Sequence, residues 1–220
     1  MPARFAEKGH VQRKEIQSVD KRPPLSHNVP TEGDGVASSM QFMRSRPDVV
    51  RSVSQRWLLS YWDRLRDKRL LPRWQGFEAE ELAAMAESLS FLDVIGSDGN
   101  ARFLIRYHGK KISEAYGSVC QGRFLDEILP PQYREAALAT YHRALVTNLP
   151  VYTIADMRDR FERIVHYERL LLPFSRDGAA IDRILASLET MSPEGAFDHH
   201  DILTPAAKPP AFALCTTIEH

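Results

Sequence analysis

The sequence is poor in cysteine and has no long apolar run. It contains two cysteines, Cys120 and Cys215, which exclude a disulfide framework and leave no CxxC metal or redox pair. No apolar run approaches the roughly 20 residues of a membrane span, and charges interrupt the first thirty residues where a signal peptide would need an apolar core. We therefore expect a soluble, cytoplasmic protein without a cleavable export signal.

An excess of charge of either sign is also lacking. Lys and Arg together number 29, as do Asp and Glu, so the formal net charge is zero. A neutral chain has no general attraction for nucleic acid or for an anionic membrane, and we expect neither as a partner. The same balance leaves self-association unopposed by charge repulsion.

Motifs of catalysis are absent from the sequence. It has no nucleophile elbow, phosphate-binding glycine loop, HExxH motif or kinase phosphoacceptor setting. Glu162 and Glu168 share one face of an expected strand, but six residues at about 3.3 Å each place them about 20 Å apart. That separation is too large for a two-carboxylate mechanism. We interpret both as solvated charges and predict that the protein is not an enzyme.

Apolar periodicity is confined to the middle of the chain. Residues 1–48 are punctuated by proline and glycine and carry few large apolar residues, and residues 190–220 show no periodicity and contain four prolines, so we expect flexible tails in both segments. The domain is expected at 52–189. It begins with an apolar stripe at Val53, Trp57, Tyr61 and Leu65, which predicts an amphipathic helix over 52–70.

The pattern after this helix predicts a mixed α+β fold. A short helix is expected at 78–88, strands at 89–95 and 101–107, and helices at 110–116, 124–129 and 132–147. Strands at 151–157, 163–172 and 180–188 complete the domain, the last two joined through Asp177-Gly178, a favourable turn pair. We predict a five-stranded antiparallel sheet with helices on one face and the amphipathic helix at the N-terminus. The strand 163–172 is apolar on both faces, so both faces are expected to be covered.

Several short segments, in this order, resemble one known family. They are Tyr61-Trp62, Leu71-Pro72-Arg73, Arg106-Tyr107-His108-Gly109, the run GSVCQGRFLDEILP at 117–130, and LLPFSRDG at 171–178. Their order and spacing over 52–188 resemble the PAS domains of the bacterial single-domain PAS_5 group, an alphaproteobacterial type. The resemblance implies a PAS fold that senses a ligand or transmits a signal through dimerisation.

A PAS-like arrangement implies a hollow between the inward sheet face and the central helices. Its candidate lining, which suits a small organic ligand, comprises Phe91, Phe103, Ile105, Ile112, Tyr116, Phe124, Leu129, Tyr141, Tyr152, Ile154 and Leu170. The alternative is that these side chains fill an ordinary core at normal packing density. Periodicity does not decide between the two.

The aromatic N-terminal helix and the odd-numbered face of the expected strand 163–172 form a candidate interface. Its residues are Trp57, Tyr61 and Trp62 on the helix and Val165, Tyr167 and Leu171 on the strand. Aromatic side chains contribute much of the binding energy at protein interfaces. The helix could equally cover its own sheet or contact a second copy of the chain, and we expect a homodimer.

No cofactor or metal site is predicted. In flavin photosensors of this fold the reactive cysteine is followed directly by Arg-Phe. In this sequence two residues, Gln121 and Gly122, separate Cys120 from Arg123-Phe124, so a flavin site is not expected. His108, His142 and His166 are interpreted as ordinary rather than haem-ligating histidines. His199-His200-Asp201 could bind a metal loosely but is interpreted as part of the tail.

Three functional hypotheses remain. The first is a PAS-like sensory module that binds a small molecule or protein partner and acts through a separate signalling protein. The second is a ligand-free interaction adaptor of the same fold. The third is a small α+β enzyme or carrier with a cone-shaped pocket, which would require an acidic or histidine pair converging in a cavity.

Overall fold

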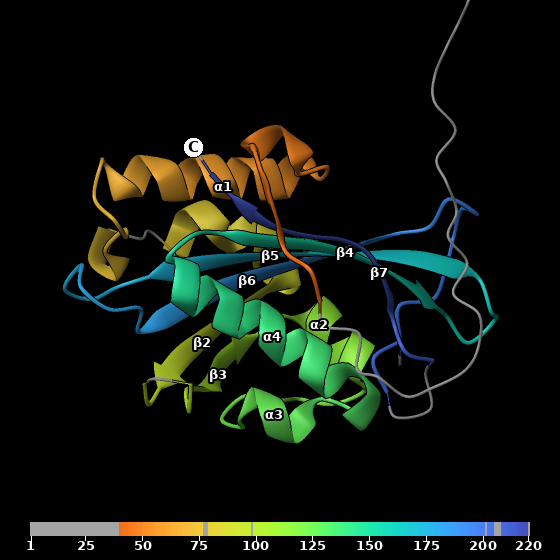
Figure 1. Ribbon diagram of the computed structural model, residues 1–220. Coiled ribbons are helices and arrows are strands. Elements are labelled where there is room, and N and C mark those ends of the chain that lie inside the picture. The colour runs from red at the N-terminus through yellow and green to blue at the C-terminus, as the bar shows by residue number, and fades with distance from the viewer. Residues whose placement is uncertain (1–39, 77–78, 98, 201, 205–207, 220) are drawn as a thin grey trace, which may run out of the picture. The chain divides into compact units, whose positions relative to one another are not determined.

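A computed structural model describes residues 40–76, 79–97, 99–200, 202–204 and 208–219. Most of the expected N-terminal tail, 1–39, lies outside the described residues. The described chain forms a mixed α+β domain around one seven-stranded sheet (Figure 1), with strand order β1-β7-β4-β5-β6-β2-β3. No helix in the described ranges is long and apolar enough to cross a bilayer.

The sheet extends the expected five strands by two. The five are β2 Leu89–Ile95, β3 Arg102–His108, β4 Val151–Arg158, β5 Ile164–Phe174 and β6 Arg183–Met191, all paired antiparallel. Two further strands, β1 Met43–Ser45 and β7 Ala211–Ile218, continue the sheet beyond β4. The expectation of five antiparallel strands therefore requires correction, because the sheet has seven and the β1–β7 pair is parallel.

Strand β7 lies where a flexible tail was expected. It pairs antiparallel with β4, and its last four residues, Cys215 to Ile218, are buried. Three prolines at 205, 209 and 210 precede this segment and interrupt the pattern from which a strand would be recognised. Strand β1 then pairs with β7, so a segment expected in the N-terminal tail also joins the sheet.

The helices form at or near the expected positions. They are α1 Val53–Arg66, α2 Lys110–Tyr116, α3 Leu125–Ile128 and α4 Pro131–Thr147, with 3₁₀ turns at Pro47–Val49, Trp74–Gly76 and Ala79–Ser88 (η3). Ser52 caps α1 by accepting a hydrogen bond from the Gln55 amide. The helix ends four residues before the expected 70, because Asp67 adopts a left-handed conformation at φ 44°.

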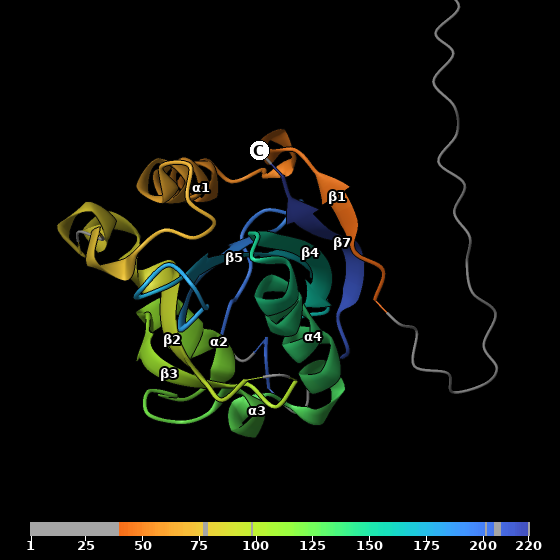
Figure 2. The ribbon, with the colours of Figure 1, turned by 60° about the vertical axis from the view of Figure 1, so that its left-hand side comes forward.

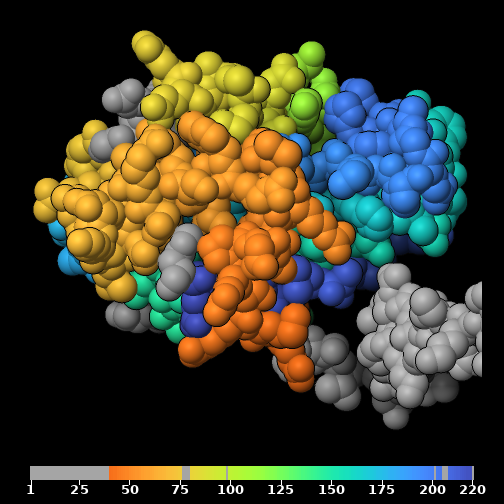
Figure 3. Space-filling view, turned by 90° about the horizontal axis from the view of Figure 1, so that it is seen from above, coloured from red at the N-terminus to blue at the C-terminus, as the bar shows by residue number. Residues whose placement is uncertain are grey.

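Helices lie on both faces of the sheet (Figure 2), and an apolar layer lies beneath them on each face. The inner layer lies between the sheet and helices α2, α3 and α4 and includes Phe103, Leu129, Tyr141, Tyr167 and Leu171. The outer layer lies between the sheet and α1 with η3, and it includes Leu58, Trp62, Leu82, Tyr152 and Leu170. Figure 3 views the molecule from the outer side, where α1 in orange and η3 in yellow cover the sheet.

Candidate functional site

The two faces of strand β5 contact the opposite layers from those predicted. Tyr167 and Leu171 point into the inner layer, and Leu170 points into the outer layer. Val165 is fully buried on the same face of the strand as Tyr167. The assignment of Val165, Tyr167 and Leu171 to an interface beneath α1 is therefore wrong. Both faces of this strand are apolar, so alternation alone cannot orient it.

The expected cavity lining is divided between the layers for the same reason. Phe103, Ile105, Leu129 and Tyr141 belong to the inner core, and Ile112 and Tyr116 border cavities beside it. Tyr152, Ile154, Leu170 and Phe91 pack in the outer layer instead, which corrects their assignment. Phe124 is half-buried under the Arg102 guanidinium, 3.8 Å from its ring centre.

A charged side chain that the sequence analysis did not single out lies within the inner layer. Arg169 is only 7% exposed. Its Nη1 donates to Thr140 Oγ1 at 3.3 Å and its Nη2 to the Tyr167 hydroxyl at 3.4 Å, while its Nε has no partner. The guanidinium lies near the rings of Tyr141 and Tyr167, at 5.8 and 5.3 Å. Among the ion pairs of the described residues, none joins Arg169 to a carboxylate.

Arg169 borders two small cavities, of about 10 and about 20 Å³. Each has room for about one water molecule. The smaller one has a polar lining that includes Ser90, His108, Tyr116, Tyr141 and Tyr167 beside Arg169. The inner core is thus closely packed, yet polar groups gather around its one buried guanidinium.

Burial favours the neutral forms of Tyr141, Tyr116 and His108, which line this cavity. It raises the pKa of Tyr141 to about 12 and that of Tyr116 well above its usual value. It lowers the pKa of His108 from 6.5 to about 4, and the His108 Nδ1 atom has no hydrogen-bond partner. Two buried nitrogens without partners, Arg169 Nε and His108 Nδ1, therefore belong to residues that line one cavity.

The buried His108 makes stability depend on pH. Because its folded pKa of about 4 lies below the ordinary 6.5, the unfolded chain binds more protons between these values, and stability falls as pH falls from about 6.5 to about 4. The His108 contribution amounts to at most about 3 kcal/mol. His108→Gln should flatten this part of the curve of unfolding free energy against pH, measured by urea denaturation. An unchanged slope in His108→Gln would contradict the assignment.

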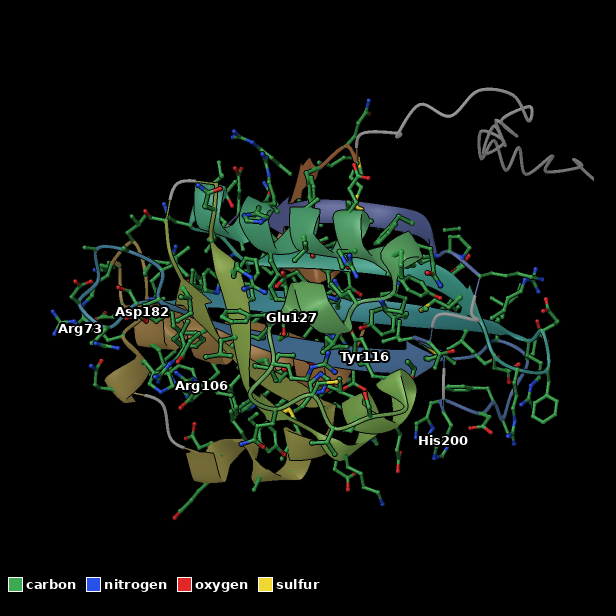
Figure 4. The ribbon with its side chains drawn as sticks, turned by 90° about the horizontal axis from the view of Figure 1, so that it is seen from below. Arg73, Arg106, Tyr116, Glu127, Asp182 and His200 are labelled. Atoms are coloured by element: carbon green, nitrogen blue, oxygen red, sulfur yellow. The ribbon has the colours of Figure 1, made fainter. Side chains whose placement is uncertain are left out.

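A larger open pocket of about 220 Å³ adjoins this cavity. It is lined by Ser88, Lys111, Ile112, Ala115, Tyr167, Leu188, Glu189, Thr190, Phe197 and His199. Tyr167 and Leu188 also line the cavity at Arg169, so these two side chains separate the two spaces. Figure 4 views the molecule from the α3 side, with Tyr116 and His200 labelled.

Three side chains of types that can bind a metal ion meet beside this pocket. Glu114 lies on α2, and His199 and His200 follow β6. The His199 Nε2 atom lies 2.7 Å from Glu114 Oε2, and this contact lowers the pKa of Glu114. The enzyme hypothesis required an acidic or histidine pair converging in a cavity; His199 lines the pocket, whereas its partner Glu114 is not among the lining residues. Asp201, the third residue of the His-His-Asp run, lies outside the described residues.

The remaining candidates occupy ordinary surroundings. Burial raises the pKa of the Cys120 thiol, which disfavours a reactive thiolate. His166 pairs with Asp156 at 2.6 Å, and the His142 ring lies 5.3 Å from that of Phe103. Glu168 corrects the expectation of a solvated charge: it is 2% exposed in the outer layer and accepts a hydrogen bond from the Tyr152 hydroxyl at 2.6 Å.

Helix α1 packs on the sheet of its own chain. Trp62 is fully buried in the outer layer and donates from Nε1 to the Pro173 carbonyl at 2.7 Å. Tyr61 is buried as well, whereas Trp57 stacks on it at 5.1 Å and remains 40% exposed. Of the three aromatic interface candidates on the helix, Trp57 alone presents a large exposed surface.

The sequence matches a model of a known protein family. A family model described as a PAS domain, PAS_5, matches residues 50–189, which contain β2 to β5, most of β6 and the helices α1 to α4. No curated protein matches the sequence. PAS domains are in general sensory and signalling modules rather than enzymes.

Proposed function

Because the chain belongs to the PAS_5 family of PAS domains, we propose that it is a sensory module whose input is a small anionic molecule bound by Arg169. The observation that carries the proposal is the buried guanidinium without a carboxylate partner in the inner layer. The class of input goes beyond what the family itself implies.

A buried charge without an opposite charge beside it is energetically costly. Removing an ion from water is unfavourable by several kcal/mol unless an opposite charge and further hydrogen bonds offset it. Thr140 and Tyr167 supply only long, neutral hydrogen bonds to Arg169. A bound anion would supply the missing charge and accept the free Nε–H. Guanidinium groups bind planar oxyanions, carboxylates above all, through two parallel hydrogen bonds.

The surrounding groups favour a compact ligand that enters from the open pocket. His108 and the tyrosine hydroxyls can donate further hydrogen bonds, and Leu129 and Leu125 provide apolar walls. The cavity itself has room for about one water molecule, so a carboxylate requires displacement of Tyr167, beyond which lies the pocket of about 220 Å³. Movement of Tyr167 would then couple ligand binding to the centre of the sheet.

A thermal-shift panel tests the proposed input. The full chain is heated at constant ionic strength in chloride and in the sodium salts of formate, acetate, pyruvate, malonate and nitrate. We expect at least one oxyanion to raise the melting temperature in a saturable manner, since a ligand that binds only the folded state stabilises it. Equal melting temperatures in all salts up to high millimolar concentrations would contradict the proposal.

The output is proposed to pass through a separate signalling protein, with the chain acting as a homodimer. Val53 and Trp57 lie four residues apart on α1 and are both exposed, which gives one helix face an apolar surface. A second copy of the chain is the partner that fits the neutral charge balance, because charge repulsion does not oppose self-association.

One observation favours the ligand-free adaptor as a second candidate. The two cavities at Arg169 are of water size, so ordered water could satisfy Arg169 Nε and His108 Nδ1. The adaptor would show no response to any anion and would keep its fold and oligomeric state when Arg169 is replaced. The thermal-shift panel therefore separates the two candidates.

A further inference from the structure

We propose that Glu114, His199 and His200 form a binding site for Zn²⁺ or a similar divalent transition-metal ion. One ligand atom from each residue lies within 4.8 Å of the other two. One carboxylate and two imidazoles are the donor set that such ions prefer, whereas Ca²⁺ and Mg²⁺ prefer oxygen ligands alone. The site is separate from Arg169 and does not depend on the function proposed for that residue.

The distances require only small side-chain movements to accommodate an ion. Zinc bonds of about 2.0–2.2 Å in a tetrahedral site place ligand atoms roughly 3.4 Å apart. Glu114 Oε2 lies 2.7 Å from His199 Nε2, and Glu114 Oε1 lies 3.9 Å from His200 Nε2. These separations fall on either side of the required value. Lys110, the other partner of Glu114 at 3.9 Å, is largely exposed and can move away.

A second, independent feature orients one of the ligands. Asp198 Oδ1 lies 2.7 Å from His200 Nδ1 and also accepts the His200 backbone N–H. A carboxylate at one imidazole nitrogen fixes the tautomer that leaves the other nitrogen free for a metal. Arg160 in turn holds Asp198 at 2.8 Å. The His200 Nε2 atom is therefore positioned as a ligand by a carboxylate–histidine pair.

The site would link two segments that are distant in sequence. Glu114 belongs to α2, whereas the histidines belong to the segment after β6. The Leu203 amide of that segment also donates a hydrogen bond to the Ala115 carbonyl of α2 at 2.9 Å. His199 lines the open pocket of about 220 Å³ as well. A bound ion would fix this segment on α2, and its fourth coordination position would stay open for water or another ligand.

Isothermal titration of the full chain with ZnCl₂ tests the site, after removal of metal with EDTA and in a non-coordinating buffer. We expect one saturable site in the wild type. Glu114→Gln and His199→Ala should each weaken it at least tenfold, and Asp198→Asn should weaken it by about 10- to 100-fold through His200. The matched control is His166→Ala, which removes a histidine–carboxylate pair that belongs to no group of three metal-binding side chains among the described residues. It should leave zinc affinity unchanged.

Two further readouts keep the result interpretable. Circular dichroism establishes that each variant is folded, and visible absorption of the Co²⁺ form reports tetrahedral coordination, which should be lost in His199→Ala. The proposal is overturned if the wild type takes up no zinc at millimolar concentrations. It is equally overturned if folded His199→Ala and Glu114→Gln bind zinc with wild-type affinity, because the ion would then bind elsewhere on the chain.

Discussion

Replacing Trp62 with alanine is expected to lower the free energy of unfolding by about 3–5 kcal/mol. The Trp62 side chain is fully buried in the outer layer, where it packs with Leu58, Leu170 and Phe174. Its removal leaves a cavity and also an unpaired Pro173 carbonyl, which now accepts the indole N–H at 2.7 Å. Equilibrium denaturation in urea, with tryptophan-independent detection by circular dichroism, measures the change.

The matched control is Trp57→Ala on the same helix. Trp57 is 40% exposed and mainly stacks on Tyr61, so its loss should change stability by less than about 1.5 kcal/mol. Equal destabilisation by the two variants would contradict the packing of α1 on its own sheet.

The same variant tests the homodimer, because light scattering should report a monomer mass for Trp57→Ala and a dimer mass for the wild type. A monomeric wild type at all concentrations would refute the dimer.

Replacing Arg169 with methionine is expected to leave the free energy of unfolding unchanged or to raise it by up to about 4 kcal/mol, although the residue is buried. Methionine fills a similar space and removes a charge that has no carboxylate partner among the described residues. The variant should also lose any stabilisation by oxyanions. If Arg169→Met gains stability and loses its response to oxyanions, then Arg169 is retained for function at the expense of stability.

Arg163→Met provides the contrasting control. Arg163 pairs with Asp159, a fully buried carboxylate, at 2.7 Å. Its removal leaves that carboxylate without its cation and should destabilise the fold. If Arg169→Met destabilises the protein as Arg163→Met does, then Arg169 has a structural role in the core, and the proposed ligand is not needed to explain it.

Much of the fold could be predicted because local patterns agree with the tertiary structure. The strand at 89–95 and the helix at 110–116 form with the expected bounds. In each case the spacing of the apolar residues changes at the ends of the element, where turn residues stand. Strand β7 could not be found in this way. Its first four residues are exposed or half-buried and prolines precede it, so its stability comes from pairing with β4 across some sixty intervening residues.

The orientation of β5 could not be read from its sequence for a different reason. Alternation of apolar and polar residues identifies the buried face of a strand only when the other face is polar, and both faces of β5 are apolar. Glu168 and Arg169 offered the missing signal. Adjacent residues of a strand point to opposite faces, so two charges within an apolar run imply one buried charge in each layer. Glu168 is instead expected from the sequence to be a solvated charge, and Arg169 is not among the predicted site residues.

The proposed metal site shows how tertiary contacts complete a partial motif. His199 and His200 are visible as a pair in the sequence, but the third ligand lies 85 residues away on α2. No periodic pattern predicts that the segment after β6 returns to this helix. The convergence follows only from the fold, in which residues around Leu203 bond to the end of α2.

The central claim, that Arg169 binds an anionic input, is tested most directly by native mass spectrometry of the chain purified without denaturation. The wild type and Arg169→Met are compared side by side, with the oxyanion of largest thermal shift added to both. The account predicts a mass increase of one ligand per chain in the wild type and none in Arg169→Met. Bare chain mass in both, or the same adduct on both, would contradict it.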